Sequence, residues 1–70
     1  MVTALPVRNE QREGVTYAKA MEVFERFFVR NQAVPTIAHQ MDIPFETACR
    51  VLGGHIWPAA YRYWLDKVLP

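Results

Sequence analysis

The chain has 70 residues, of which 51% are hydrophobic and 21% are charged, and eight Lys and Arg against seven Asp and Glu leave a formal net charge of +1. This length limits the protein to one domain, and the hydrophobic share excludes a disordered chain. The near-neutral charge excludes a strong long-range attraction to nucleic acid or to an anionic membrane.

Residues 1–14 are predicted to form a flexible arm. Pro6 and Gly14 interrupt any regular pattern there, and the polar cluster RNEQRE has no period typical of a helix or a strand. From such an arm, Arg8 and Arg12 would contact the DNA backbone or dock on a protein. The plainer interpretation is a frayed terminus whose charges are solvated.

A first helix is predicted from Tyr17 to about Arg30, with Thr16 as its N-cap. Its apolar residues recur at steps of three and four, which is typical of a helix with one face in the core. Glu22 and Arg26 have the spacing of an exposed ion pair. The apolar stripe consists of Ala20, Met21, Phe24, Phe27 and Phe28.

Two short helices joined by a tight turn are predicted next. The first spans residues 35–41, and the second begins at Pro44 or Phe45 and ends at the Gly53-Gly54 pair. Proline is favoured in the first turn of a helix, because its missing N–H would have no partner there. Glycine is favoured just after the last turn, where the chain often needs a positive φ.

This stretch has the residue spacing of a helix-turn-helix. A small residue in the first helix, a residue able to take positive φ in the turn, and two apolar residues in the second helix are expected, and these are Ala38, Asp42, Ala48 and Val51. Asp42 stands where glycine is usual, which is tolerable because Asp adopts the left-handed region at modest cost. The inner face and the plug of the turn are predicted to be Ile37, Met41 and Ile43.

A last helix is predicted from Pro58 to about Val68, with an apolar stripe made of Tyr61, Trp64, Leu65 and Val68. Trp57 and Tyr63 lie off this stripe. Both are candidate interface residues, since aromatic side chains dominate the energetics of many interfaces. For Trp57 a place in the core is equally consistent with the pattern.

Together these elements predict an all-α fold. It is a small three- to four-helix domain over residues 15–70 that contains a helix-turn-helix, preceded by the flexible arm. The single cysteine, Cys49, excludes an intrachain disulfide and fits a reducing compartment. No apolar run is long enough to cross a bilayer, and no signal peptide is recognisable, so we expect a soluble cytoplasmic protein with no membrane partner.

The segment TIAHQMDIPFETACRVLGG, residues 36–54, resembles the DNA-binding headpiece of the lactose-repressor family. The shared pattern in the second helix reads Thr47, Ala48, Cys49, Arg50, Val51, Leu52. The long preceding helix is similar to that of the three-helix domains of resolvases and DNA invertases, and the ending VLGGHIW resembles segments of phage and mobile-element proteins. The resemblance implies that Phe45, Glu46 and Arg50 read base edges and that Thr36 and Thr47 hold the DNA backbone.

Two features oppose DNA binding. Both short helices are expected to start with a proline, which lacks the N–H that a helix N-terminus offers to phosphate. From residue 31 onward the charges also balance, with Arg50, Arg62 and Lys67 against Asp42, Glu46 and Asp66. If the chain binds DNA, much of the affinity must therefore come from the earlier cations or from a homodimer.

The leading hypothesis is a small helix-turn-helix transcription regulator that inserts its third helix into the major groove of double-stranded DNA. The alternative keeps the fold but binds a protein, as a phage-type inhibitor that docks on RNA polymerase or on a host transcription factor would. We do not expect an enzyme, a metal or a cofactor. A catalytic thiol would have to come from Cys49 together with His39 or His55. A metal site made of these three residues and Asp42 is not expected either, because their spacings match no structural zinc pattern.

Overall fold

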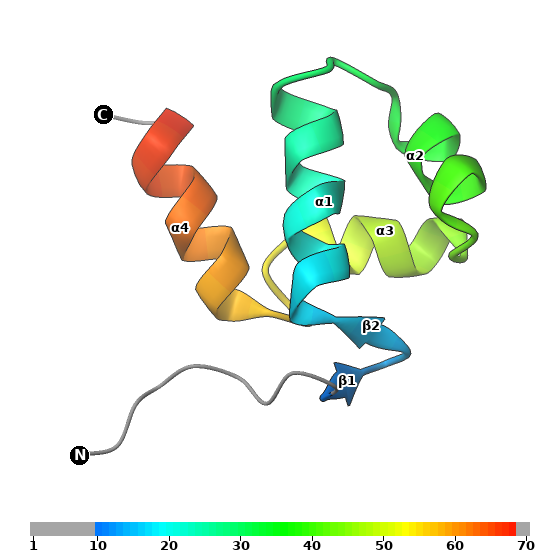
Figure 1. Ribbon diagram of the computed structural model, residues 1–70, viewed down its shortest axis with the longest axis horizontal. Coiled ribbons are helices and arrows are strands. Elements are labelled where there is room, and N and C mark those ends of the chain that lie inside the picture. The colour runs from blue at the N-terminus through cyan, green and yellow to red at the C-terminus, as the bar shows by residue number, and fades with distance from the viewer. Residues whose placement is uncertain (1–9, 69–70) are drawn as a thin grey trace.

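The computed structural model describes residues 10–68, and Figure 1 shows them as a short β-hairpin followed by four helices. The elements are β1 (Gln11–Arg12), β2 (Val15–Thr16), α1 (Tyr17–Phe28), α2 (Val34–Met41), α3 (Phe45–Leu52) and α4 (Pro58–Val68). The predicted helical fold is thus confirmed, but it is not purely α. The hairpin also corrects the predicted arm: residues 1–9 lie outside the described part, whereas residues 11–14 belong to the hairpin.

The hairpin depends on a two-residue turn with positive φ at both positions. β1 and β2 pair antiparallel, with Arg12 opposite Val15. Between them, Glu13 and Gly14 have φ angles of 54° and 80°. Two-residue turns of this hand match the twist of the flanking strands, and glycine adopts such angles freely whereas glutamate does so at a cost.

Helix α1 begins and ends for local reasons. The hydroxyl of Thr16 accepts a hydrogen bond from the backbone N–H of Lys19 at 3.1 Å, as predicted for the N-cap. The helix ends at Phe28, and Asn31 then takes a φ of 58°. Asparagine tolerates this left-handed conformation, which turns the chain toward α2. The predicted ion pair of α1 also forms, with 2.8 Å between Arg26 and Glu22.

The turn between α2 and α3 has the conformation that the spacing predicts. Asp42 takes φ 57° and ψ 48°, in the left-handed region. The backbone N–H of Ile43 donates to the carbonyl of Ala38 at 3.0 Å and so closes the end of α2. Ala38 and Ala48 are both buried, which lets the two short helices approach closely.

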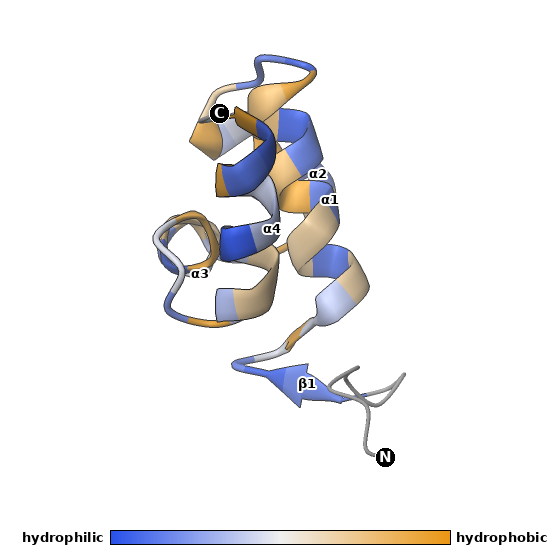
Figure 2. Ribbon diagram, turned by 90° about the vertical axis from the view of Figure 1, so that its left-hand side faces the viewer, coloured by the Kyte–Doolittle hydropathy of each residue, from blue (hydrophilic) through white to orange (hydrophobic). Residues whose placement is uncertain are grey.

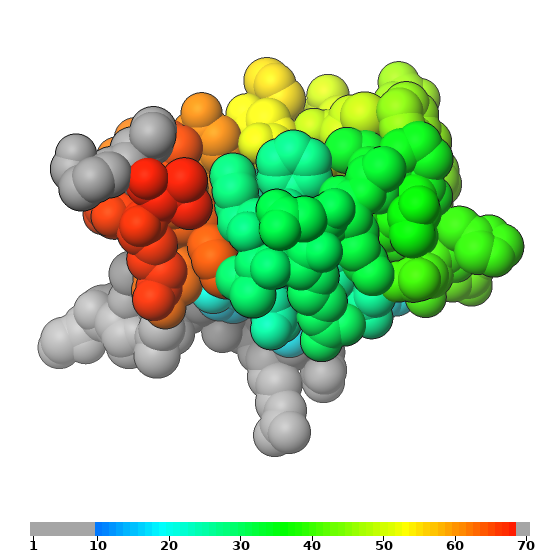
Figure 3. All heavy atoms as spheres, turned by 90° about the horizontal axis from the view of Figure 1, so that it is seen from above, coloured from blue at the N-terminus to red at the C-terminus, as the bar shows by residue number. Residues whose placement is uncertain are grey.

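The four helices form two layers. In Figure 1, α4 lies beside α1 on one side and α2 on the other, and α3 crosses behind α1. Figure 2, turned by 90°, shows α3 and α1 on opposite sides of α4, and Figure 3 shows the same order from above, with α3 along the back. The buried core between the layers consists of Val15, Ala20, Val23, Phe24, Ile37, Met41, Val51, Ile56, Trp57 and Ala60.

Trp57 belongs to this core, which corrects its assignment as an interface candidate. Only 2% of its surface is exposed, and its indole Nε1 donates to the backbone carbonyl of Val15 at 2.8 Å. Its ring meets the ring of Tyr17 edge-on at 5.5 Å, and the guanidinium of Arg12 lies 4.0 Å from its centroid. Trp57 therefore ties the hairpin to the linker between α3 and α4.

Gly54 makes the approach of α4 possible. It has a φ of 82°, and a Cβ atom added to it would lie 2.7 Å from the ring of Tyr61. A larger residue would push α4 away from the end of α3.

No helix within residues 10–68 combines the length and the apolar character that crossing a bilayer requires.

The left-handed conformation of Asp42, which orients α3 relative to α2, can be tested by substitution. Replacing the exposed Asp42 with valine should lower the free energy of unfolding by about 1–2 kcal/mol, because a β-branched residue is strained at positive φ. Asp42→Gly is the matched control and should unfold at the same temperature as the unmodified chain or higher. Thermal unfolding followed by circular dichroism measures both, and equal stability of the two variants would contradict the turn geometry.

Candidate nucleic-acid interface

The outer side of α3 carries the side chains predicted to read bases. Phe45 is 55% exposed and Glu46 is also exposed, while Ala48 and Val51 turn inward to the core. Arg50 is half-buried on the same outer side, one turn beyond Glu46. The structure thus brings the three predicted base-reading residues onto one side of one helix.

The start of α3 differs from the prediction in a way that favours anion binding. Pro44 is the N-cap and the helix begins at Phe45, so the first-turn residues from Phe45 to Thr47 all keep their backbone N–H groups. Such groups are the usual phosphate ligands at a helix N-terminus. In α2, which begins at Val34, Pro35 does remove one first-turn donor. The expected loss of a donor therefore holds for α2 and is wrong for α3.

The predicted backbone-binding residues are placed unevenly. Thr36 is exposed in the first turn of α2, and Thr47 is half-buried in the first turn of α3. Arg12 lies over the ring of Trp57 and pairs with Glu10 at 3.1 Å, rather than extending from a free arm. Arg8 lies outside the described residues.

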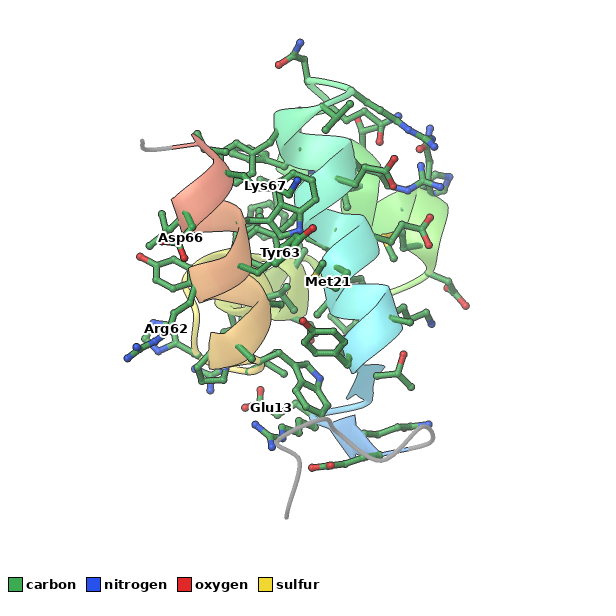
Figure 4. All side chains as sticks on the ribbon, turned by 60° about the vertical axis from the view of Figure 1, so that its left-hand side comes forward. Glu13, Met21, Arg62, Tyr63, Asp66 and Lys67 are labelled. Atoms are coloured by element: carbon green, nitrogen blue, oxygen red, sulfur yellow. The ribbon has the colours of Figure 1, made fainter. Side chains whose placement is uncertain are left out.

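Arg50 is held by Glu13, which was not among the predicted site residues. Its Nε and Nη2 atoms donate to the two carboxylate oxygens of Glu13, each at 2.8 Å. Glu13 sits in the hairpin turn, at the end of the molecule where α1 and α4 begin (Figure 4). The Glu13-Gly14 pair was the only sequence signal for this turn, and no local pattern connects it with a residue in α3.

This bidentate pair shifts both ionisation equilibria. The hydrogen bonds from Arg50 lower the pKa of Glu13 below its ordinary value of 4.5, and those to Glu13 raise the pKa of Arg50. Both side chains stay accessible, with 43% of Arg50 and 47% of Glu13 exposed. Water and salt weaken such a pair, so a stronger partner can displace Glu13.

The residues considered for other chemistry do not converge. His39, Cys49 and His55 are each exposed, on α2, on α3 and in the linker before α4. Within residues 10–68, no three His, Cys, Asp or Glu side chains gather where they would hold a metal ion. Tyr63, the other interface candidate, is 46% exposed on α4, where it lines the space between α4 and α1.

Comparison of the chain with protein-family models, with curated proteins and with solved structures finds no match.

The Glu13–Arg50 pair predicts a pH-dependent contact between the hairpin and α3. Because the pKa of Glu13 is lower in the folded chain, the pair stabilises the fold above pH 4.5 and is lost as the pH falls through the lowered pKa. A carboxyl-carbon NMR titration should give Glu13 a lower midpoint in the unmodified chain than in Arg50→Gln. Arg62→Gln, on α4, is the control and should leave the midpoint unchanged; equal midpoints in all three proteins would show that the pair does not form.

Proposed function

We propose that the chain is a small helix-turn-helix transcription regulator that binds double-stranded DNA by placing α3 in the major groove. The observation that carries the proposal is the exposed outer side of α3. This helix follows the left-handed turn at Asp42, and no other helix of residues 10–68 covers its outer side. A helix presented in this way has the width that the major groove admits.

Each exposed group on α3 has a matching feature in a DNA groove. Phe45 would contact a thymine methyl group, and Glu46 would accept a hydrogen bond from a cytosine amino group. Arg50, once released from Glu13, presents the two-pronged donor that pairs with O6 and N7 of guanine. The free N–H groups at the start of α3 and the hydroxyls of Thr36 and Thr47 would hold the sugar-phosphate backbone.

The charge balance makes Arg50 decisive for this function. The chain has a net charge of +1, so few counterions are released when it binds DNA and non-specific affinity is low. Glu46 also brings a negative charge near the phosphates. The affinity for DNA then depends on a small number of groups. The free energy needed to separate Arg50 from Glu13 is therefore a substantial part of the free energy of binding.

DNA binding is tested by two substitutions with opposite expected effects. Arg50→Ala should weaken binding to the preferred duplex, selected from a random-sequence pool at low salt, by about tenfold or more, because the guanine contact is lost. Glu13→Gln should strengthen it by about two- to fivefold, because Arg50 no longer has to leave a carboxylate. Fluorescence anisotropy measures both affinities.

The control for these variants is Arg62→Ala, since Arg62 lies on α4 and is not part of α3. It should change the affinity by less than either of them. If no duplex is retained at low salt, or if Arg50→Ala and Arg62→Ala have equal effects, the DNA proposal is wrong.

The alternative function is a protein-binding regulator with the same arrangement of helices, docking on RNA polymerase or a transcription factor. Two observations favour it. Phe45 exposes 55% of its surface at the start of α3, where an aromatic side chain is typical of a protein-binding anchor. Arg50 is already paired with Glu13, which reduces the positive charge available for phosphates.

A pull-down from a cellular lysate, with and without nuclease, separates the two functions. A protein partner should remain bound after nuclease treatment and should be lost with Phe45→Ala, whereas a partner that co-purifies through DNA should disappear after nuclease. Cys49→Ala, a change on the same exposed side of α3, is the control and should retain the partner. Capture that depends on nuclease-sensitive material in every case would contradict the protein-binding alternative.

A further inference from the structure

A groove runs between α1 and α4 on the side of the molecule opposite to α3. Its volume is about 440 Å³, and the side chains that line it include Met21, Glu25, Val29, Tyr63, Trp64 and Lys67. Figure 4 shows Met21, Tyr63 and Lys67 in the space between the two helices, whereas Arg62 and Asp66 lie on the outer side of α4. The groove is therefore separate from the outer side of α3.

The groove combines exposed apolar surface with an unsatisfied donor. Val29 is 60% exposed and Tyr63 is 46% exposed, both in its lining, and Val68 at the end of α4 is 40% exposed. The indole Nε1 of Trp64 is buried and has no hydrogen-bond acceptor among the described residues. Buried N–H groups are almost always paired in native proteins, and clustered apolar side chains on a small domain mark an interaction surface.

The charges of the two walls are opposite. Glu22 and Glu25 line the groove from α1, and Lys67 lines it from α4. Glu22 already pairs with Arg26, but Glu25 and Lys67 form no ion pair with another described residue. Arg30, which follows α1, adds a second cation at the far end of the groove.

The charges of the groove walls are complementary to those of the same groove in a second copy of the chain. α1 and α4 run in the same direction (Figure 1), so a twofold axis along the groove would set α1 of one copy against α4 of the other. Glu25 of each copy would then face Lys67 of the other, twice in the dimer. A twofold axis across the groove would instead bring the two Glu25 side chains together, which is unfavourable.

We propose that this groove is the interface between two copies of the chain, with α1 of each copy packed on α4 of the other. The exposed side chains of Val29 and Tyr63 fill the opposite groove, and the acidic side chain of Glu25 faces Lys67 of the other copy. A chain of 70 residues buries a modest share of its surface by itself, and this pairing extends its apolar contacts.

The inference goes beyond the proposed function and does not rest on it. In such a dimer α3 remains on the outer side of each copy, so both recognition surfaces stay uncovered and point away from each other. The two α3 helices would then reach separate DNA segments or separate protein partners, instead of neighbouring grooves of one duplex.

The charge pattern permits a reciprocal test by sedimentation equilibrium on the full chain. The unmodified chain should form a concentration-dependent dimer. Glu25→Lys alone and Lys67→Glu alone should each weaken self-association by about tenfold or more, because each places like charges opposite each other twice. An equal mixture of the two variants should restore the dimer as a heterodimer, since every pair is then again opposite in charge.

Arg62→Glu is the matched control for Lys67→Glu, because it makes the same charge change on the outer side of the same helix, and it should leave the dimer unchanged. Circular dichroism melting confirms that each variant is folded. The proposal is overturned if the folded unmodified chain stays monomeric up to millimolar concentration, if the single variants dimerise as well as it does, or if their mixture fails to associate.

Discussion

The buried indole of Trp57 is the junction on which the rest of the structure depends. Its hydrogen bond to the carbonyl of Val15 ties β2 to the linker before α4, and its ring packs against Tyr17 at the start of α1. One such bond adds about 1 kcal/mol to stability. The hairpin, the start of α1 and the start of α4 are thus held at one point. That point fixes both the turn that reaches Arg50 and the angle at which α4 leaves α3.

The two-layer arrangement gives the molecule two surfaces with different chemistry. The outer side of α3 is amphipathic, with an aromatic ring, a carboxylate and a guanidinium on one short helix. The groove between α1 and α4 combines apolar side chains with charges of opposite sign on its walls. Because the core separates the two surfaces, one partner on each can be bound at the same time. The first surface carries the proposed recognition of DNA, and the second carries the proposed pairing of two copies.

Electrostatics decides how strongly α3 can bind an anion. A chain with a net charge of +1 has an excess of only one cation to attract DNA from a distance, so in the proposed function local groups must supply the affinity. Arg50 is the cation on the outer side of α3, and Glu13 holds it in an accessible, salt-sensitive pair. Pro44 at the N-cap leaves the N–H groups of the first turn in place. The proposed binding by α3 is thus a competition between the hairpin turn and an incoming partner for the same guanidinium.

By itself, the sequence determined the helices and the turn between α2 and α3, because these depend on residues close together in the chain. The Thr16 cap, the apolar period of α1 and the left-handed Asp42 were all predicted from local patterns, and so was the common side of α3 that Phe45 and Arg50 share. Only the tertiary structure decided the hairpin, the burial of Trp57 and the pairing of Arg50 with Glu13. Glu13 and Arg50 are 37 positions apart, and an ion pair between such distant residues depends on how the packed core orients the elements that carry them. Local propensity contains no information about that orientation, so the sequence located α3 but not the residue that restrains Arg50 on it.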